Sequence, residues 1–233
     1  MRIALAEDEP DIAAHMQEGI ARTGIVCDLF VDGPSLVNGL QRGTYDVVLA
    51  DWNIPEPNGI EVVRWAQNQL ESPPPFVMLT SRSDADDIVE ALEAGACDYI
   101  VKPEDIRIVV ARLKAAARRG AAPDKERVVT YGRYSFDRLY STATLDDEPI
   151  KLTAKEFELA LTLFQNRDRP LARSYLLGEV WGANDQVETR TLDMHVSRVR
   201  NKLRLNPENG FVIQSVFGFG YRLEGYADGE EAT

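Results

Sequence analysis

Five short apolar segments alternate with five amphipathic segments through the first half of the chain. The apolar segments cover residues 2–6, 26–30, 46–50, 76–79 and 99–101. The amphipathic segments cover residues 11–23, 34–41, 59–70, 84–94 and 105–118. Short apolar runs are typical of buried parallel strands, and helices between such strands form right-handed crossovers. The pattern predicts an α/β fold with a doubly wound, five-stranded parallel sheet.

Charged and polar side chains end four of these predicted strands. Glu7 and Asp8 follow the first strand and Asp51 follows the third, whereas Thr80 and Lys102 end the fourth and the fifth. The carboxyl ends of parallel strands meet at one edge of the sheet, where open α/β sheets bind their ligands. Clustered carboxylates suit Mg²⁺, and a carboxylate can carry a covalent phosphoryl group. The sequence therefore predicts a site for a hard cation and a phosphoryl group.

The second half of the chain has a different pattern. Residues 128–150 alternate between apolar and polar side chains, which predicts a small antiparallel sheet. Thr153 and Glu156 have the spacing of a capping box, and a helix to residue 165 should follow them. The later elements are predicted as helices at residues 174–180 and 188–204 and a hairpin at residues 211–223. The whole chain is then predicted to comprise a first domain (1–119), a linker (120–127), a smaller α+β domain (128–225) and a tail (226–233).

One helix-length stretch is basic in a chain whose net charge is −12. Residues 190–204 carry five basic side chains and one acidic side chain. The apolar side chains of this stretch recur at helical spacing and define one buried face, whereas cationic side chains occupy another. A helix with one buried face and one cationic face fits the major groove of duplex DNA. The hairpin that follows can bring Arg222 to a minor groove.

Composition narrows the class of protein further. The only cysteines are Cys27 and Cys97, and no metal-ligand spacing surrounds them, so a reducing compartment is expected. No apolar run approaches the length of a membrane span, and acidic residues come too early at the N-terminus for a signal peptide. A cytoplasmic protein without a membrane partner is expected.

Residues 1–119 resemble the receiver domain of two-component signalling. The matching residues are Glu7-Asp8, Asp51, Ile54-Pro55, Asn58-Gly59, Leu79-Thr80, Asp98-Tyr99 and Lys102-Pro103. The resemblance implies that a sensor histidine kinase phosphorylates Asp51, with Thr80 and Lys102 assisting. It also implies a cis peptide bond before Pro103 and a switch role for Tyr99. The Mg²⁺ ligands that it implies are Glu7, Asp8, Asp51 and the carbonyl of Asn53.

Residues 128–225 resemble the winged-helix effector domain of the OmpR/PhoB family. The matching residues include Leu152-Thr153, Glu156-Phe157, Val180-Trp181-Gly182, Arg190-Thr191, His195-Val196-Ser197-Arg198 and Gly220-Tyr221-Arg222. The resemblance implies base reading by Arg198 and Met194 and a minor-groove contact by Arg222. The implied phosphate contacts are those of Arg190, Thr191, His195 and Arg200. Helical spacing places Lys202 on one face with Thr191, His195 and Arg198, so we expect it to contact DNA as well. The loop at residues 181–188 would face RNA polymerase.

Departures from the family pattern concern the dimer face and the wing. Receivers of this family pair through their fourth helix, fifth strand and fifth helix, helped by an ion pair whose positions are Ile88 and Ile108 here. We hypothesise that an apolar contact across the dimer replaces this pair; the alternative is that both side chains join the receiver core. Asp98 and Arg112 remain as an intersubunit pair. At the wing, Phe217 replaces a common arginine and removes one phosphate contact.

The sequence favours a response regulator that dimerises and binds promoter DNA when it is phosphorylated. A regulator of the same fold that works without phosphorylation is the main alternative. A phosphohydrolase with Asp51 as its nucleophile is disfavoured, because Asp51-Trp52-Asn53 lacks a second acid and no cap domain is apparent. A pure interaction module would leave the basic stretch unexplained. We therefore expect a phosphoryl acceptor with, at most, slow self-hydrolysis, and not an enzyme.

Overall fold

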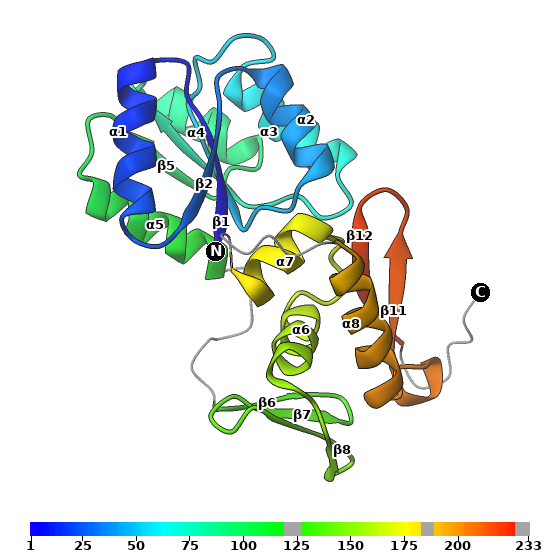
Figure 1. Cartoon of the computed structure of the whole chain (residues 1–233). Helices are drawn as coiled ribbons and strands as arrows, with labels where there is room; N and C mark the ends of the chain where they lie inside the picture. Colours follow the sequence, from blue (N-terminus) through cyan, green and yellow to red (C-terminus); the bar gives the residue numbers. More distant parts are fainter. Residues whose placement is uncertain (119–126, 183–188, 227–233) are drawn as a thin grey trace. The chain divides into compact units, whose positions relative to one another are not determined.

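The computed structural model describes residues 1–118, 127–182 and 189–226, and its contacts divide the chain into two compact units after Gly120 (Figure 1). The predicted linker and the predicted tail lie outside the described residues, except for Arg127 and Tyr226. Each unit is described by itself below.

The first unit contains a five-stranded parallel sheet with the strand order β2-β1-β3-β4-β5. Its strands are β1 (Arg2–Ala6), β2 (Val26–Phe30), β3 (Val47–Ala50), β4 (Phe76–Thr80) and β5 (Asp98–Val101). The central strands β3 and β4 are buried along their whole length, because helices cover both faces of the sheet. The predicted fold class of this half is confirmed.

Helices form two layers around this sheet (Figure 1). They are α1 (Pro10–Ala21), α2 (Gly33–Arg42), α3 (Gly59–Gln69), α4 (Ala85–Glu93) and α5 (Ile106–Arg118). Buried side chains of α1 and α5 pack on one face of the sheet, and those of α2, α3 and α4 pack on the other. The two apolar cores therefore hold the strand ends in fixed positions at the edge where the predicted site lies.

The start of α3 is fitted closely to the end of β3. Asn58 and Glu61 form a capping box, in which each side chain accepts a hydrogen bond from the other's backbone N–H. Gly59 follows directly, and a Cβ at this position would lie only 2.0 Å from the carbonyl oxygen of Asp51. Only glycine allows this approach, so the Asn58-Gly59 pair fixes the loop that carries Asp51.

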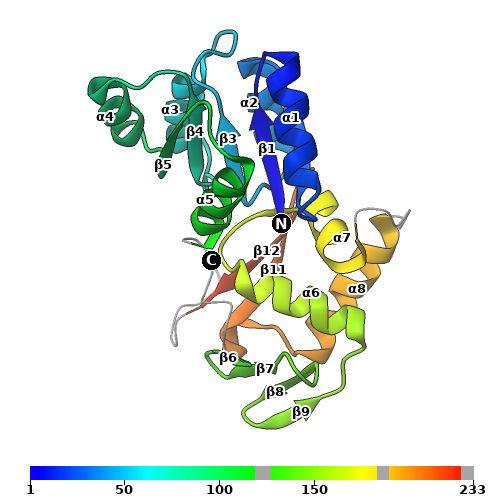
Figure 2. The same ribbon diagram turned by 90° about the vertical axis from the view of Figure 1, so that its left-hand side faces the viewer.

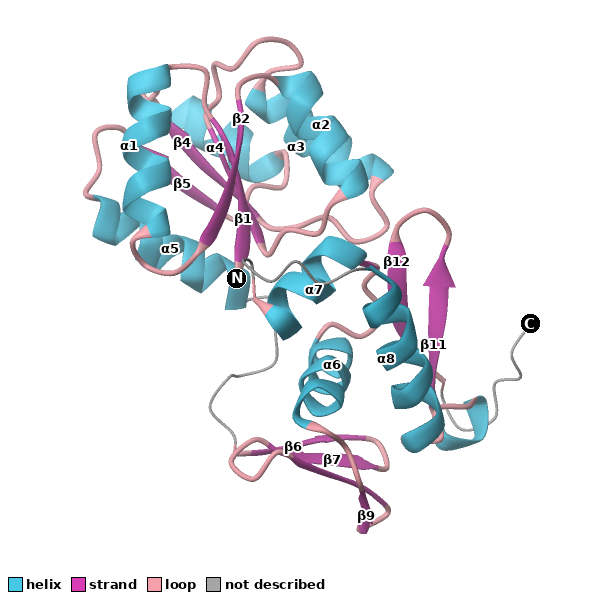
Figure 3. Ribbon diagram, viewed as in Figure 1, coloured by secondary structure: helices cyan, strands magenta, loops and turns pink. Residues whose placement is uncertain are grey.

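The described residues of the second unit form two small antiparallel sheets, three α-helices and a short 3-10 helix at Pro207–Asn209. Figure 3 shows these helices and strands. The first sheet consists of β6 (Val128–Tyr131), β7 (Tyr134–Asp137), β8 (Thr142–Leu145) and β9 (Glu148–Ile150). The helices are α6 (Ala154–Gln165), α7 (Arg173–Trp181) and α8 (Thr189–Lys202). The second sheet has the order β10-β12-β11, with β10 (Leu171–Ala172), β11 (Phe211–Val216) and β12 (Gly220–Gly225). The predicted winged-helix architecture is confirmed, but β10, only two residues long, was not predicted.

An aromatic cluster forms the core of the second unit. The ring of Phe164 on α6 lies 4.9–5.3 Å from the rings of Tyr131, Tyr134, Phe136 and Phe211. These partners come from β6, β7 and β11, so a single side chain of α6 joins the two sheets. The predicted capping box of Thr153 and Glu156 is confirmed at the start of the same helix.

Candidate acidic site and nucleic-acid interface

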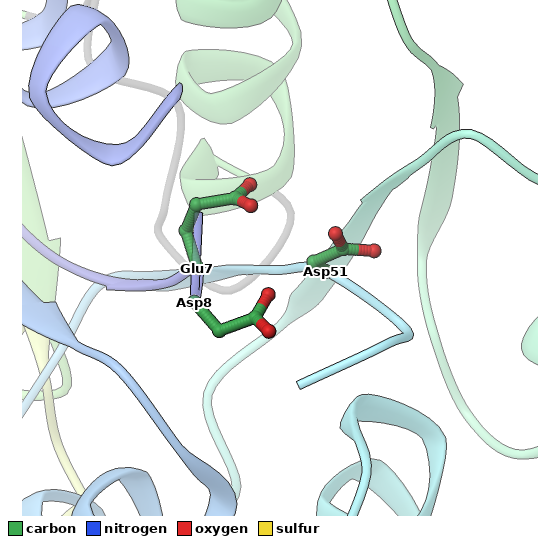
Figure 4. Close-up of side chains that lie close together, drawn as sticks. All are labelled: Glu7, Asp8 and Asp51. Atoms are coloured by element: carbon green, nitrogen blue, oxygen red, sulfur yellow. The ribbon is translucent and has the colours of Figure 1, made fainter. Parts of the chain in front are cut away.

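Three carboxylates meet at the carboxyl edge of the five-stranded sheet, as Figure 4 shows. Glu7 and Asp8 follow β1, Asp51 follows β3, and one oxygen atom of each lies within 4.8 Å of the others. Glu7 and Asp51 are buried, whereas Asp8 is exposed to solvent. The structure therefore brings the three predicted carboxylates together.

Lys102 supplies the positive charge of this site. Its Nζ donates hydrogen bonds to Glu7 Oε2 at 2.7 Å and to Asp51 Oδ2 at 2.8 Å. The side chain is only 11% exposed and follows β5, and its peptide bond to Pro103 is cis, as predicted. A second cis bond, Glu56–Pro57, was not predicted. One ammonium group faces three carboxylates, so the cluster keeps an excess of negative charge.

Burial and this excess charge shape the protonation of the site. Burial raises the pKa of Glu7, although the hydrogen bond and charge of Lys102 oppose the rise. Burial alone would lower the pKa of Lys102, but its hydrogen bonds to Asp51 and Glu7 raise it above the ordinary value. The ammonium of Lys102 and the burial of Glu7 thus act on the Glu7 pKa in opposite directions, and a further cation beside Glu7 would lower this pKa.

The residues of this cluster fit a divalent cation. Glu7 Oε1 is buried and has no hydrogen-bond partner among the described residues. A buried carboxylate oxygen without a partner is costly, and a cation would satisfy it. Asn53 lies beside the cluster, since its backbone N–H donates to Asp51 Oδ1 at 3.2 Å. The donors are all oxygens, which is the set that Mg²⁺ prefers.

Thr80 and Tyr99 both contact the backbone of Arg82. The hydroxyl oxygen of the buried Thr80 accepts the N–H of Arg82 at 3.4 Å. The hydroxyl of the half-buried Tyr99 donates to the carbonyl oxygen of Arg82 at 3.0 Å. Thr80 and Tyr99, to which the resemblance assigns a joint switch, therefore both hydrogen-bond the backbone of the same residue, Arg82.

The side chain of Arg82 also reaches the site, and sequence reasoning missed it. Its guanidinium stacks over the ring of Trp52, with 4.7 Å to the ring centre, and its Nη1 pairs with Asp87 of α4 at 3.2 Å. Its Nη2 donates to Asn53 Oδ1 at 3.4 Å. The sequence did offer a signal for Arg82, because it is the one basic residue between Thr80 and the acidic first turn of α4.

Figure 2 shows α4, β5 and α5 at one side of the first unit. The face that they form is partly apolar. β5 is the edge strand, and both helices contact it. Large apolar side chains exposed on this face are Val89, Leu92, Val101 and Ile108. Ile108 is 43% exposed and does not join the core, and Ile88 is half-buried outside the core clusters. Asp98 and Arg112 form an ion pair within the chain at 3.0 Å, so an intersubunit pair would first have to break it.

The helix α8 has the buried face that its sequence predicts, whereas two members of the predicted polar face, Thr191 and His195, are half-buried. Its buried side chains, Leu192, Val196 and Val199, lie in the core of the second unit. The side chains of Arg190, Met194 and Arg198 are exposed. The predicted start of this helix at residue 188 lies outside the described residues, as do residues 183–188 of the loop predicted to face RNA polymerase.

His195 and Thr191 interact with each other on this helix. The Nδ1 of His195 lies 2.8 Å from the carbonyl oxygen of Thr191, and its ring packs edge-on against Trp181. A carbonyl oxygen only accepts hydrogen bonds, so Nδ1 carries a proton.

Three further cations that were predicted to contact DNA also have partners within the unit. Arg200 Nη2 donates to the carbonyl oxygen of Ile213 on β11 at 2.8 Å. Lys202 pairs with the buried carboxylate of Glu156 at 2.6 Å, and Arg222 pairs with Glu224 at 2.5 Å. Lys202 therefore ties the end of α8 to the start of α6, a structural role that the sequence pattern did not indicate.

None of the described helices is both long and apolar enough to cross a lipid bilayer.

Comparison with known proteins finds a match in each half of the chain. Residues 3–114 match the model of the response regulator receiver domain, and residues 147–223 match that of the C-terminal domain of transcriptional regulatory proteins. The sensory transduction protein RegX3 of Mycolicibacterium smegmatis is 36% identical over 227 residues, which is 96% of this chain and 99% of that protein. The phosphate regulon transcriptional regulatory protein PhoB of Pseudomonas aeruginosa is 38% identical over 179 residues, 76% of this chain and 77% of PhoB.

Among solved structures, the response regulator DrrB of Thermotoga maritima, an OmpR/PhoB homologue, is 28% identical. The match covers 96% of this chain and 99% of DrrB, with a TM-score of 0.46. A relative that is 36% identical over nearly the full length of both chains, together with a domain match in each half, shows the family. The chain belongs to the OmpR/PhoB family of two-component response regulators.

Proposed function

We propose that this chain is a transcription regulator controlled by phosphorylation of Asp51. The observation that carries the proposal is the ammonium of Lys102, which lies within 2.8 Å of oxygens of both Asp51 and Glu7 beside a third carboxylate. This arrangement neutralises part of the charge that a phosphoryl group would bring. The donor would be the phosphohistidine of a sensor kinase or a small acyl phosphate.

The transfer joins a carboxylate oxygen of Asp51 to phosphorus. As this bond forms, the bond from phosphorus to the donor's imidazole nitrogen breaks, and the imidazole leaves with the bonding electron pair. Lys102 stabilises the charge that moves onto the phosphoryl oxygens. The resulting acyl phosphate hydrolyses slowly, which is the only turnover that we expect of this protein.

Mg²⁺ would be held by Glu7, Asp8, Asp51 and the backbone carbonyl of Asn53. When it is bound, the ion supplies positive charge next to the phosphoryl oxygens and satisfies the orphaned Glu7 Oε1. Glu7 and Asp8 then serve mainly to place that charge, whereas Asp51 both binds and reacts.

Thr80 and Tyr99 would respond to the phosphoryl group. The Thr80 hydroxyl can turn to donate a hydrogen bond to a phosphoryl oxygen, which weakens its contact with the Arg82 N–H. The loop would then shift, and the Tyr99 hydroxyl would leave the Arg82 carbonyl and turn inward. Since Tyr99 lies on β5, this movement would change the face formed by α4, β5 and α5.

Phosphorylation is tested with acetyl phosphate and Mg²⁺, read by intact mass and peptide mapping. We expect the wild type to gain the mass of one phosphoryl group, located on Asp51, and the Asp51→Asn variant to gain none. The Lys102→Met variant should be labelled far more slowly. Equal labelling of the wild type and the Asp51→Asn variant would refute the assignment.

Receiver pairing through α4, β5 and α5 would make the active form a homodimer. Ile88 and Ile108 would replace an exposed ion pair worth about 0–1 kcal/mol by apolar contacts worth about 1.5–3 kcal/mol per buried side chain. The exposed apolar face also favours a second candidate, a regulator that is dimeric without phosphate. Sedimentation of Ile108→Glu and wild type, each with and without acetyl phosphate, separates these proposals. An unchanged dimer constant in Ile108→Glu would contradict both.

Promoter DNA would lie against α8 and the β11–β12 hairpin. Arg198 and Met194 would read bases, and Arg222 would reach the minor groove. Phosphate contacts would come from Arg190, Thr191, His195, Arg200 and Lys202. We expect Arg198→Ala to relax base choice and Arg200→Ala to weaken binding evenly across sequences. Equal losses on cognate and random duplexes for both variants would contradict this division of roles.

Partners and location follow from the same proposal. A sensor histidine kinase would supply the phosphoryl group, and RNA polymerase would contact the loop that begins at Trp181. A cytoplasmic protein with no membrane partner fits all of these contacts.

A further inference from the structure

The tip of the β11–β12 hairpin carries an aromatic side chain that contacts almost nothing. Phe217 has a relative exposure of 104%, the largest of any large apolar side chain in the described parts of the chain. Its neighbour Phe219, two residues on, packs against the core of the second unit. A three-residue turn therefore directs one phenyl ring inward and holds the other in solvent.

The turn has a defined backbone conformation. Gly218 adopts a left-handed conformation with φ of +70°, and the N–H of Phe219 donates to the carbonyl oxygen of Val216 at 3.0 Å. The strands below the turn pair in continuous register from Phe211↔Gly225 to Val216↔Gly220. Phe217 therefore lies in a hydrogen-bonded turn at the end of a paired two-stranded ribbon.

The ribbon is also fixed to the helix α8 at two points. Arg200 of the helix donates to the carbonyl oxygen of Ile213 at 2.8 Å, and the hydroxyl of Tyr221 donates to Asp193 Oδ1. The position of the tip relative to the exposed face of α8 is therefore set by the fold. A helix in the major groove would carry this tip to the adjacent minor groove.

The charge around the tip fits a polyanion. The hairpin of β11 and β12 contains a single acidic side chain, Glu224, near the end away from the turn, although the whole chain has 38 acidic residues. Arg222 lies opposite Gln214 in the middle of the ribbon, where it pairs with Glu224, and Arg200 of α8 contacts the ribbon at Ile213. Arg198 is exposed on α8. An apolar tip with arginines on the neighbouring ribbon and helix resembles proteins that insert apolar wedges between base steps in a minor groove.

We propose that Phe217 inserts into the minor groove of the bound duplex as an apolar wedge and bends the DNA there. The inference rests on the proposed binding of DNA by this unit. A wedge opens a base step, so it favours flexible pyrimidine–purine steps at its position. Phe217 thereby adds sequence preference through DNA deformation, where an arginine would add only a charge contact.

The test uses the phosphorylated full chain and a duplex selected by the wild type from a random-sequence library. Phe217→Ala should bind this duplex about 10- to 100-fold more weakly, the effect of losing one buried phenyl side chain. Energy transfer between dyes at the duplex ends should show that the variant has lost most of the bend. Tyr140→Ala, which removes an exposed aromatic ring from the β7–β8 turn, should change neither quantity.

Phe217→Arg separates a wedge from a simple contact. It should regain affinity at low salt, increase the slope of affinity against salt by about one, and leave the duplex straight. Binding and bending of Phe217→Ala equal to those of the wild type would overturn the inference while leaving DNA binding intact. Loss of self-association in this variant, with DNA bending unchanged, would show that the tip meets a second copy and would also overturn it. Failure of the wild type to select or bind any duplex would overturn the proposed function itself.

Discussion

Replacing Lys102 by methionine removes the only ammonium group that contacts the acidic site within the described residues. The side chains of Glu7, Asp51 and Lys102 are 1%, 6% and 11% exposed, so water screens their charges little. Removing one partner of a buried ion pair costs about 3–5 kcal/mol, because the remaining charge has no compensation. Here two carboxylates lose their shared donor at once. We expect Lys102→Met to lower the free energy of unfolding of the first unit by at least this amount in the absence of Mg²⁺.

Mg²⁺ and low pH should each restore part of this loss. An ion at 100 times its dissociation constant stabilises the folded state by about 2.7 kcal/mol, and the variant should bind it more tightly because no ammonium competes. Burial already raises the pKa of Glu7 above 4.5, and the loss of Lys102 raises it further. The carboxyl group of Glu7 then binds a proton more tightly in the folded variant than in the unfolded chain. The free energy of unfolding of Lys102→Met should therefore fall as the pH rises from 4.5 through the raised pKa of Glu7.

Hydrogen exchange at the amides of β1 and β3 in the full chain measures this effect, since those strands belong to the first unit. The matched control is Lys114→Met, which alters an exposed lysine on α5. A loss in Lys102→Met within about 0.5 kcal/mol of the control, the range of ordinary surface changes, would refute the reasoning. A larger stabilisation by Mg²⁺ in the wild type than in Lys102→Met would also refute it.

Three further changes test other parts of the structure. Phe164→Ala should lower the free energy of unfolding of the second unit by about 3–5 kcal/mol, because four rings lose their common partner; denaturant titration that shows less than 1 kcal/mol would contradict the packing. Lys202→Met should cost about 1–3 kcal/mol. Burial alone would raise the pKa of Glu156, but Lys202 and the Thr153 N–H lower it overall. The wild type should therefore lose stability as the pH falls below 4.5, and Lys202→Met should lose less. Parallel plots of stability against pH for the two proteins would argue against the pair. Arg82→Ala should change the emission of Trp52 when Trp65 and Trp181 are replaced by phenylalanine, and an unchanged spectrum would rule out the stacking.

The pattern of apolar runs was sufficient to predict the parallel sheet and the placement of Asp51. Strand ends in a parallel sheet meet at one edge, so the positions of Glu7, Asp8 and Lys102 along the chain determined their meeting in space. The capping box at Thr153 was predictable for a similar reason, because it depends only on residues three apart.

Contacts between distant segments were not predictable in this way. The strand β10 is two residues long and exists only because β12 pairs with it, so it has no periodicity of its own. The pair of Lys202 with Glu156 joins residues 46 positions apart, and a basic face on a helix does not reveal which cation has a buried partner. Arg82 was missed because its role depends on the ring of Trp52 and on Asp87, which only the folded chain brings together.

The central claim is that phosphorylation of Asp51 governs DNA binding by the second unit. The most direct measurement is the affinity for a selected duplex before and after treatment with acetyl phosphate and Mg²⁺, in the wild type and in Asp51→Asn. The account predicts that treatment raises the affinity of the wild type by about 10²–10⁴-fold, the gain expected from pairing two DNA-binding units, and leaves the variant unchanged. An equal rise in both proteins, or a fully labelled wild type whose affinity does not change, would contradict it.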